Sequence, residues 1–143
     1  MTVSDLYSMA EEDDIGVYAF DLGRHAALSV RHEDWTCDIA LDMGKIETTA
    51  EEKTLLGHEM GHCETGSFYN QYTPWDVRQR HENRADRWAI THLCPYEEML
   101  EAMRSGITEL WDLADRFTVT EDFVRMAYEY YTGPCGLSFD YAS

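Results

Sequence analysis

The sequence has few basic residues for its size. Its 143 residues include 11 Lys and Arg against 28 Asp and Glu, and the formal net charge is −17 at pH 7. A surface of this charge repels a phosphate backbone, which excludes direct nucleic-acid binding as the expected role. The charge suits a protein that approaches a basic partner, although it also serves solubility alone.

Long hydrophobic runs are missing as well. No stretch approaches the roughly 20 apolar residues that span a bilayer, and the start of the chain, residues 1–5, lacks the pattern of a signal peptide. These two absences predict a cytoplasmic protein without a membrane partner. With 44% hydrophobic and 13% aromatic residues the chain can still build a core, so it is not expected to be disordered.

The close cysteine pairs of a zinc finger are also absent. Cys37, Cys63, Cys94 and Cys135 are widely scattered along the chain. In a reducing cytosol we expect four free thiols, most of them buried. Cys63 follows a histidine of the motif described next, but neighbouring helix positions point about 100° apart, so we expect it to serve in packing.

The pentad His58-Glu59-Met60-Gly61-His62 is the most informative motif in the chain. On a helix, the spacing of four residues stacks His58 and His62 on one face, where two imidazoles can share a tetrahedral Zn²⁺. Glu59 then lies beside the metal and can take a proton from an activated water. The pentad alone leaves open a plain helix with two surface histidines around a glutamate.

A second motif offers the third ligand that a catalytic zinc needs. The metzincin pattern fails, because Thr65 and Phe68 stand where it requires Gly and His. The segment 80–90 instead places Glu82 and Asp86 on one helix face, with small alanines beside them that let two helices approach closely. Glu82 is the expected ligand, and Asp86 the acceptor for the second ring N–H of a ligating histidine. A solvated acidic face is the alternative for this pair.

The two motifs together resemble those of the ImmA/IrrE metallopeptidases. The resemblance rests on residues 58–70, on residues 82–90 and on Pro95, and it spans roughly residues 15 to 131. The small versions carried by phages and integrative elements of Gram-positive bacteria are the most similar in character. Longer relatives have extra sensory or DNA-binding-like segments for which this chain has no room.

The resemblance implies a role for each motif residue. His58, His62 and Glu82 would bind zinc, and Glu59 would be the catalytic base. Family members are implicated in cleaving or inactivating helix-turn-helix repressors. The implied function is therefore a zinc-dependent metalloendopeptidase that acts on such a repressor of a phage or mobile element.

Two other functions stay open at this point. A non-catalytic zinc-containing module could sequester a regulatory protein without cutting it, although such a module would not need Glu59. A structural zinc could hold the helices together, but it would require a fourth protein ligand that the sequence does not offer. By analogy with other His-Glu-x-x-His proteases, we expect an extended substrate to pair with a sheet edge, and the strand Ile39-Ala40-Leu41 is our candidate. Tyr69, Tyr72 and His81 are possible oxyanion donors, but packing or surface roles are the better expectation for each.

The predicted fold is α+β in a single zincin-like domain, residues 1–143. Strands at 15–22, 26–30 and 37–41 would form a small antiparallel or mixed sheet, packed on a zincin-like helical core with C-terminal helices. The first 14 residues are predicted as a loose arm or a short amphipathic helix, and residues 132–143 as a loose tail.

Helix boundaries follow from local signals. The motif helix should begin near Thr48 or Thr49, run to about Cys63 and break at Gly66. The second should take Asp76 as its N-cap and stop before Pro95. Three more helices are predicted at 96–104, 108–116 and 121–131. The last two suggest a helix-turn-helix, but the second is acidic, so we interpret them as a structural hairpin.

Overall fold

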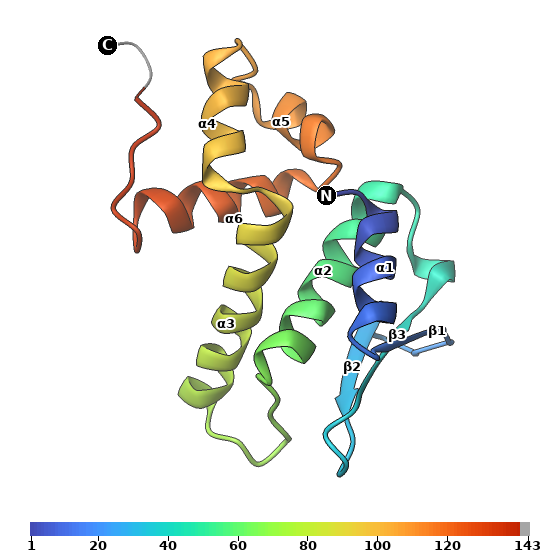
Figure 1. Cartoon of the computed structure of the whole chain (residues 1–143). Helices are drawn as coiled ribbons and strands as arrows, with labels where there is room; N and C mark the ends of the chain where they lie inside the picture. The colour runs from blue at the N-terminus through green and yellow to red at the C-terminus, as the bar shows by residue number, and fades with distance from the viewer. Residues whose placement is uncertain (141–143) are drawn as a thin grey trace.

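The computed structural model describes residues 1–140, and within them the fold is α+β with six α-helices and a three-stranded mixed sheet (Figure 1). The elements in chain order are α1 (Val3–Glu12), β1 (Gly16–Ala19), β2 (Ala27–Arg31), β3 (Cys37–Leu41), a 3-10 turn (Met43–Lys45), α2 (Thr49–Thr65), α3 (Trp75–Leu93), α4 (Tyr96–Arg104), α5 (Leu110–Phe117) and α6 (Glu121–Thr132). No helix among residues 1–140 has both the length and the apolar character to cross a bilayer.

The sheet has the order β1-β3-β2. β1 runs parallel to β3, and β2 runs antiparallel to it. Alternate residues of β3, Cys37, Ile39 and Leu41, are buried. Ile39 and Leu41 share one core with residues of α1 and α2, so the helices cover one face of the sheet.

The first residues form a packed helix rather than a loose arm. Thr2 and Asp5 make a reciprocal capping box at the start of α1, which stabilises its first turn. Leu6 and Ala10 are buried against the core, and the Tyr7 hydroxyl donates to Glu52 of α2 over 2.6 Å. Of the two structures open for residues 1–14, the amphipathic helix is the one observed.

The boundaries of α2 follow their predicted signals. The Thr48 side chain accepts a hydrogen bond from the Glu51 N–H and caps the helix, and Gly66 ends it in the left-handed conformation, φ 67°. The predicted N-cap of α3 is wrong. The helix begins at Trp75, Pro74 is its N-cap residue with no side-chain cap hydrogen bond, and Asp76 lies inside the first turn.

The C-terminal helices cover the end of the core. The α5–α6 hairpin is attached to α2, since the Lys53 ammonium donates to Phe117 O and the Thr120 N–H donates to Thr54 Oγ1. The chain after α6 is held too: Phe139 is buried, with its ring 5.2 Å from that of Tyr128. The predicted loose tail is therefore anchored to the core at Phe139, although residues 133–138 are exposed, and residues 141–143 lie outside the described part.

Two of the predicted free thiols are joined. Cys37 at the start of β3 and Cys63 near the end of α2 form a disulfide, with Cα atoms 5.9 Å apart. The prediction of four free thiols is wrong for this pair because two residues 26 positions apart in sequence meet where the strand crosses the helix. Cys94 is free and buried, whereas Cys135 is free and exposed.

Candidate metal centre

The three predicted ligands lie together between α2 and α3. His58 and His62 point from α2 with their Nε2 atoms 3.2 Å apart. Glu82 on α3 places Oε2 3.0 Å from His58 Nε2, and Oε1 3.4 Å from His62 Nε2. One ligand atom from each residue therefore falls within 4.8 Å of the other two.

The two helices can meet this closely because small residues face each other. A Cβ atom added to Gly61 would lie 2.4 Å from the carbonyl oxygen of Ala85, which is fully buried. One turn earlier, a Cβ added to Gly57 would lie 2.5 Å from Leu93 Cδ1. Gly61, the fourth residue of the His-Glu-Met-Gly-His pentad, thus brings the backbone of α3 against α2 and places Glu82 beside the histidines.

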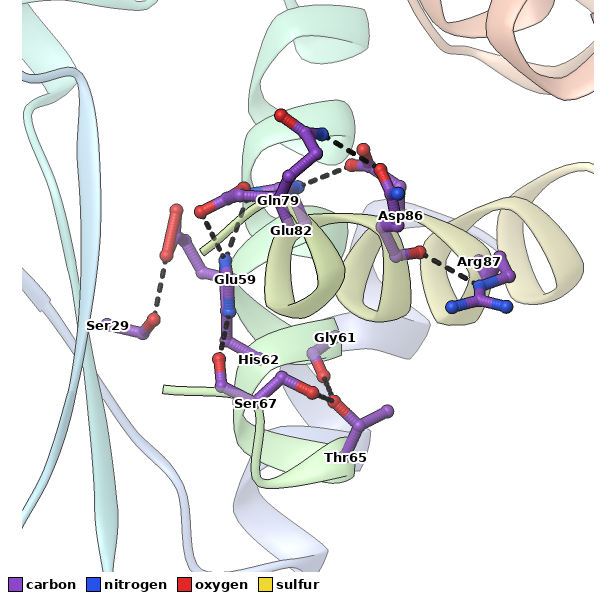
Figure 2. Close-up of polar contacts among 12 residues, drawn as sticks. Ser29, Glu59, Gly61, His62, Thr65, Ser67, Gln79, Glu82, Asp86 and Arg87 are labelled. Carbon is purple, nitrogen blue, oxygen red and sulfur yellow. Dashed lines mark hydrogen bonds and ion pairs between the residues drawn. The ribbon is translucent and has the colours of Figure 1, made fainter. Parts of the chain in front are cut away.

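The second nitrogen of each histidine has an acceptor. His58 Nδ1 lies 2.8 Å from Asp86 Oδ1. His62 Nδ1 lies 2.5 Å from the carbonyl oxygen of Ser67, as Figure 2 shows. A carbonyl oxygen can only accept, so Nδ1 of His62 carries the proton, and an ionised Asp86 imposes the same tautomer on His58. In their neutral forms both imidazoles therefore present an Nε2 lone pair toward Glu82.

Such a cluster of lone pairs attracts positive charge. Burial opposes protonation of His58, but hydrogen bonds to Asp86 and Glu82 outweigh it and raise the pKa of His58 to about 10. Burial likewise opposes protonation of His62, yet its contacts with Glu82 and Ser67 raise its pKa. Hydrogen bonds from the two histidines hold the pKa of Glu82 well below its usual range. Two imidazole nitrogens and a carboxylate, each held by a hydrogen bond between its side chain and a neighbouring residue, fit a first-row divalent metal ion.

Glu59 lies beside this cluster and is almost buried, with 8% of its surface exposed. Its Oε1 accepts a hydrogen bond of 2.8 Å from the hydroxyl of Ser29 on β2 (Figure 2). The cluster and Glu59 open into a cleft of about 300 Å³. Its walls are formed by β2 and the preceding residues, by α2, by the loop after α2 and by α3; they comprise His25, Ala27, Leu28, Ser29, His58, Glu59, His62, Ser67, Phe68, Tyr69 and Glu82.

The tyrosines and the histidine that the sequence offered as possible oxyanion donors, and a further histidine near the cleft, lie in different parts of the structure. The Tyr69 hydroxyl donates to Glu82 Oε1 over 2.6 Å, and this bond and burial raise the pKa of Tyr69 to about 12. Tyr72 is 83% exposed and lies away from the cleft walls, while His81 stacks on Tyr69. His25, which has no ligand-spaced partner in sequence, lines the cleft beside β2.

The strand that borders the cleft is β2. The prediction that Ile39-Ala40-Leu41 forms the substrate-binding edge of the sheet is wrong. β3 is the middle strand and is paired on both sides. At the two ends of β2, backbone hydrogen bonds run from Asp42 N to Ala26 O and from His32 N to Thr36 O. The residues opposite each other at these two places are therefore hydrogen-bonded pairs of the ladder. Bonded and non-bonded pairs alternate in an antiparallel ladder. The β2 residues whose N–H and C=O groups point to the free edge are therefore Ala27, Ser29 and Arg31.

Sequence reasoning did not find Ser29 or Ser67. Ser29 belongs to a different element, and neither its type nor its spacing from residue 59 marks it. Ser67 acts through its backbone carbonyl, which any residue type could supply. For Ser67 the signal was positional: it follows Gly66, whose left-handed conformation turns the chain back over His62.

A protein-family model matches most of the chain. The family model Peptidase_M78, described as the IrrE N-terminal-like domain, matches residues 17–128, a range that runs from within β1 through most of α6 and includes both motifs. No curated protein and no solved structure shows significant similarity to the chain.

Proposed function

The chain belongs to the IrrE N-terminal-like family of metallopeptidases, and from this premise we propose that it is a zinc-dependent endopeptidase. His58, His62 and Glu82 are the proposed metal ligands, with Asp86 holding His58 in the ligating tautomer. Glu59 is the proposed general base. The observation that carries the proposal is the convergence of three ligand atoms beside a buried carboxylate in one cleft.

The residues present suit a catalytic metal better than a structural one. Three protein ligands leave a coordination position open, whereas structural zinc sites have four. Both free cysteines, Cys94 and Cys135, are outside the cleft, so neither supplies a fourth ligand. When bound, such an ion polarises a peptide carbonyl and lowers the pKa of water.

Glu59 carries the proton transfers in this proposal. Its carboxylate accepts a proton from the water that attacks the scissile carbonyl carbon, and later delivers it to the nitrogen of the leaving amine. Burial keeps bulk water away from the carboxylate, which strengthens its interaction with the reacting groups. The Tyr69 hydroxyl, already at the cleft wall, is a donor that could turn from Glu82 to the developing oxyanion.

An extended peptide would bind along β2. The free edge of this strand offers backbone donors and acceptors from Ala27 to Arg31, and a peptide paired with it would run past Glu59. This arrangement replaces the β3 edge expected from sequence. This binding mode requires a substrate segment that is locally unfolded or can unfold.

The family implies a protein substrate, and we extend the proposal to a helix-turn-helix repressor of a phage or mobile element. Support comes from charge. A repressor presents a basic DNA-reading face, and this chain carries a net charge of −17. The same charge makes direct DNA binding by the chain itself unfavourable.

The test combines metal content with cleavage. Zinc-loaded protein is incubated with a pool of proteome-derived peptides, and new termini are identified by mass spectrometry. Glu59→Gln should keep zinc and lose cleavage, because the amide cannot accept the proton. Glu64→Gln, on the same helix but outside the cleft, is the matched control and should cleave normally.

The outcomes separate the functions. Cleavage that survives Glu59→Gln would refute the general-base role. A protein that binds zinc, cuts nothing in the pool and captures an intact repressor equally well with Gln at position 59 would be the sequestering module instead.

A further inference from the structure

The carboxylate of Glu59 has one hydrogen-bond partner among residues 1–140, the hydroxyl of Ser29. The bond joins Ser29 Oγ to Oε1 over 2.8 Å and connects two elements 30 positions apart in sequence. A carboxylate offers about four lone-pair positions, and an almost buried one gains little from bulk water. The Ser29 contact is therefore the polar contact that fixes which way this carboxylate faces.

The geometry of β2 makes Ser29 a rigid donor. Its neighbours in the strand are bonded to β3, which fixes the backbone, and its side chain points to the helix side of the sheet. Serine has a single side-chain torsion before the hydroxyl, so little freedom is left once the strand is in place. An ionised carboxylate only accepts, so the hydroxyl proton must point to Oε1.

We propose that Ser29 is a positioning residue for the peptidase reaction. By donating to Oε1 it holds Glu59 in one orientation and leaves Oε2 free toward the cleft for proton transfer. The N–H and C=O groups of Ser29 lie at the free edge of β2, so the same residue contacts the base through its side chain and an edge-bound peptide through its backbone. This inference rests on the proposed role of Glu59 as general base.

The kinetic test separates this role from substrate binding. Ser29→Ala removes the hydroxyl but keeps the backbone groups at the edge, so kcat should fall about 10- to 100-fold on the best-cleaved peptide of the pool while KM stays within about twofold. Ser29→Thr keeps a hydroxyl on a residue that suits a strand and should restore most of kcat. Ser29→Cys keeps the side-chain shape with a weak donor and should resemble alanine. Ser8→Ala, on an exposed position of α1, is the matched control.

A binding measurement tests the same point without turnover. Acetohydroxamic acid binds metal ions as its anion, and in the proposed site the carboxylate of Glu59 accepts the proton that it loses. Calorimetric titration of the zinc-loaded variants should give a Kd about tenfold weaker for Ser29→Ala, nearly normal for Ser29→Thr and weakest for Glu59→Gln. Thermal unfolding and zinc content, measured first, should match the parent protein in each variant used.

Each result decides something. Weakening in Ser29→Ala with rescue by threonine supports the positioning role. If Ser29→Ala binds acetohydroxamic acid and turns over peptide like the parent while Glu59→Gln does not, the role of Ser29 is refuted and the proposed function stands. If Glu59→Gln also equals the parent in peptide turnover and in acetohydroxamic acid binding, the general-base role fails and that of Ser29 fails with it.

Discussion

Gly61→Ala is the sharpest perturbation of the contact that brings the three proposed metal ligands together. The added methyl would lie 2.4 Å from Ala85 O and 3.0 Å from both Ala85 C and Ala85 Cα. Ordinary van der Waals contact begins near 3.4 Å, and the difference between 3.4 and 2.4 Å means a shift of about 1 Å. Because the atoms met are backbone, α3 itself must move, and Glu82 moves with it.

The expected change in the free energy of unfolding has two opposing contributions. Alanine is better than glycine in a helix interior by about 1 kcal/mol. Overpacking against a backbone costs about 1–3 kcal/mol. The variant should therefore lose up to about 2 kcal/mol in free energy of unfolding, which lowers Tm by about 2–4 °C per kcal/mol. Metal sites tolerate ligand shifts of only about 0.2 Å. A displacement of about 1 Å should weaken zinc binding at least tenfold.

Gly57→Ala is the matched control. It lies one turn earlier on the same helix, but its added Cβ would meet the end of the Leu93 side chain, 2.5 Å from Cδ1. A side chain can change rotamer where a backbone cannot, so we expect stability within about 1 kcal/mol of the parent and unchanged zinc affinity. The assay is thermal unfolding of the metal-free proteins together with zinc titration against a competing chelator. Equal zinc affinity in the two variants would refute the argument that Gly61 sets the distance of Glu82.

Three further predictions concern the surroundings of the centre. Asp86→Ala should weaken zinc binding about 10- to 100-fold, measured by chelator competition, because His58 loses the acceptor that fixes its tautomer; unchanged affinity would mean that Asp86 is only a surface acid. Replacing Cys37 and Cys63 by serine should lower the free energy of unfolding by about 3 kcal/mol in urea titrations, since the disulfide closes a loop with a separation of 26 residues. An unchanged urea midpoint under oxidising conditions would contradict this prediction. Zinc binding at pH 7 should release protons and should tighten as the pH rises toward about 10, because the raised pKa of His58 keeps its imidazole protonated in the metal-free protein and the metal must displace that proton. Calorimetry in two buffers of different ionisation enthalpy would detect the proton release. Its absence would show that the metal does not bind at the imidazole of His58.

Sequence alone could predict features that depend on neighbouring residues. The limits of β3 and α4 match the prediction, and α2 ends at Gly66 as expected, because caps, glycines and prolines act locally. Within each motif the helical repeat places two chemical groups on one face before any tertiary structure is known. That Glu82 of α3 meets His58 and His62 of α2 depends on the packing of the two helices, and it was expected because the two motifs together resemble those of a known family.

Features that depend on long-range packing could not be predicted in this way. The disulfide joins residues whose spacing has no motif, and its formation depends on β3 crossing the end of α2. The order of strands in a sheet likewise depends on which pairings form in space, not on their order in the chain. The burial of Phe139 against Tyr128 follows from the place where α6 happens to end beside α4.

Strand order has the largest consequence for the proposed function, because it decides which strand offers a free edge to a peptide. β3, the edge expected from sequence, is the middle strand, whereas β2 has a free edge and carries Ser29, whose hydroxyl donates to Glu59. In the proposed mechanism, peptide binding and orientation of the base therefore share one residue. A displacement of β2 should therefore disturb catalysis even where the metal ligands stay in place.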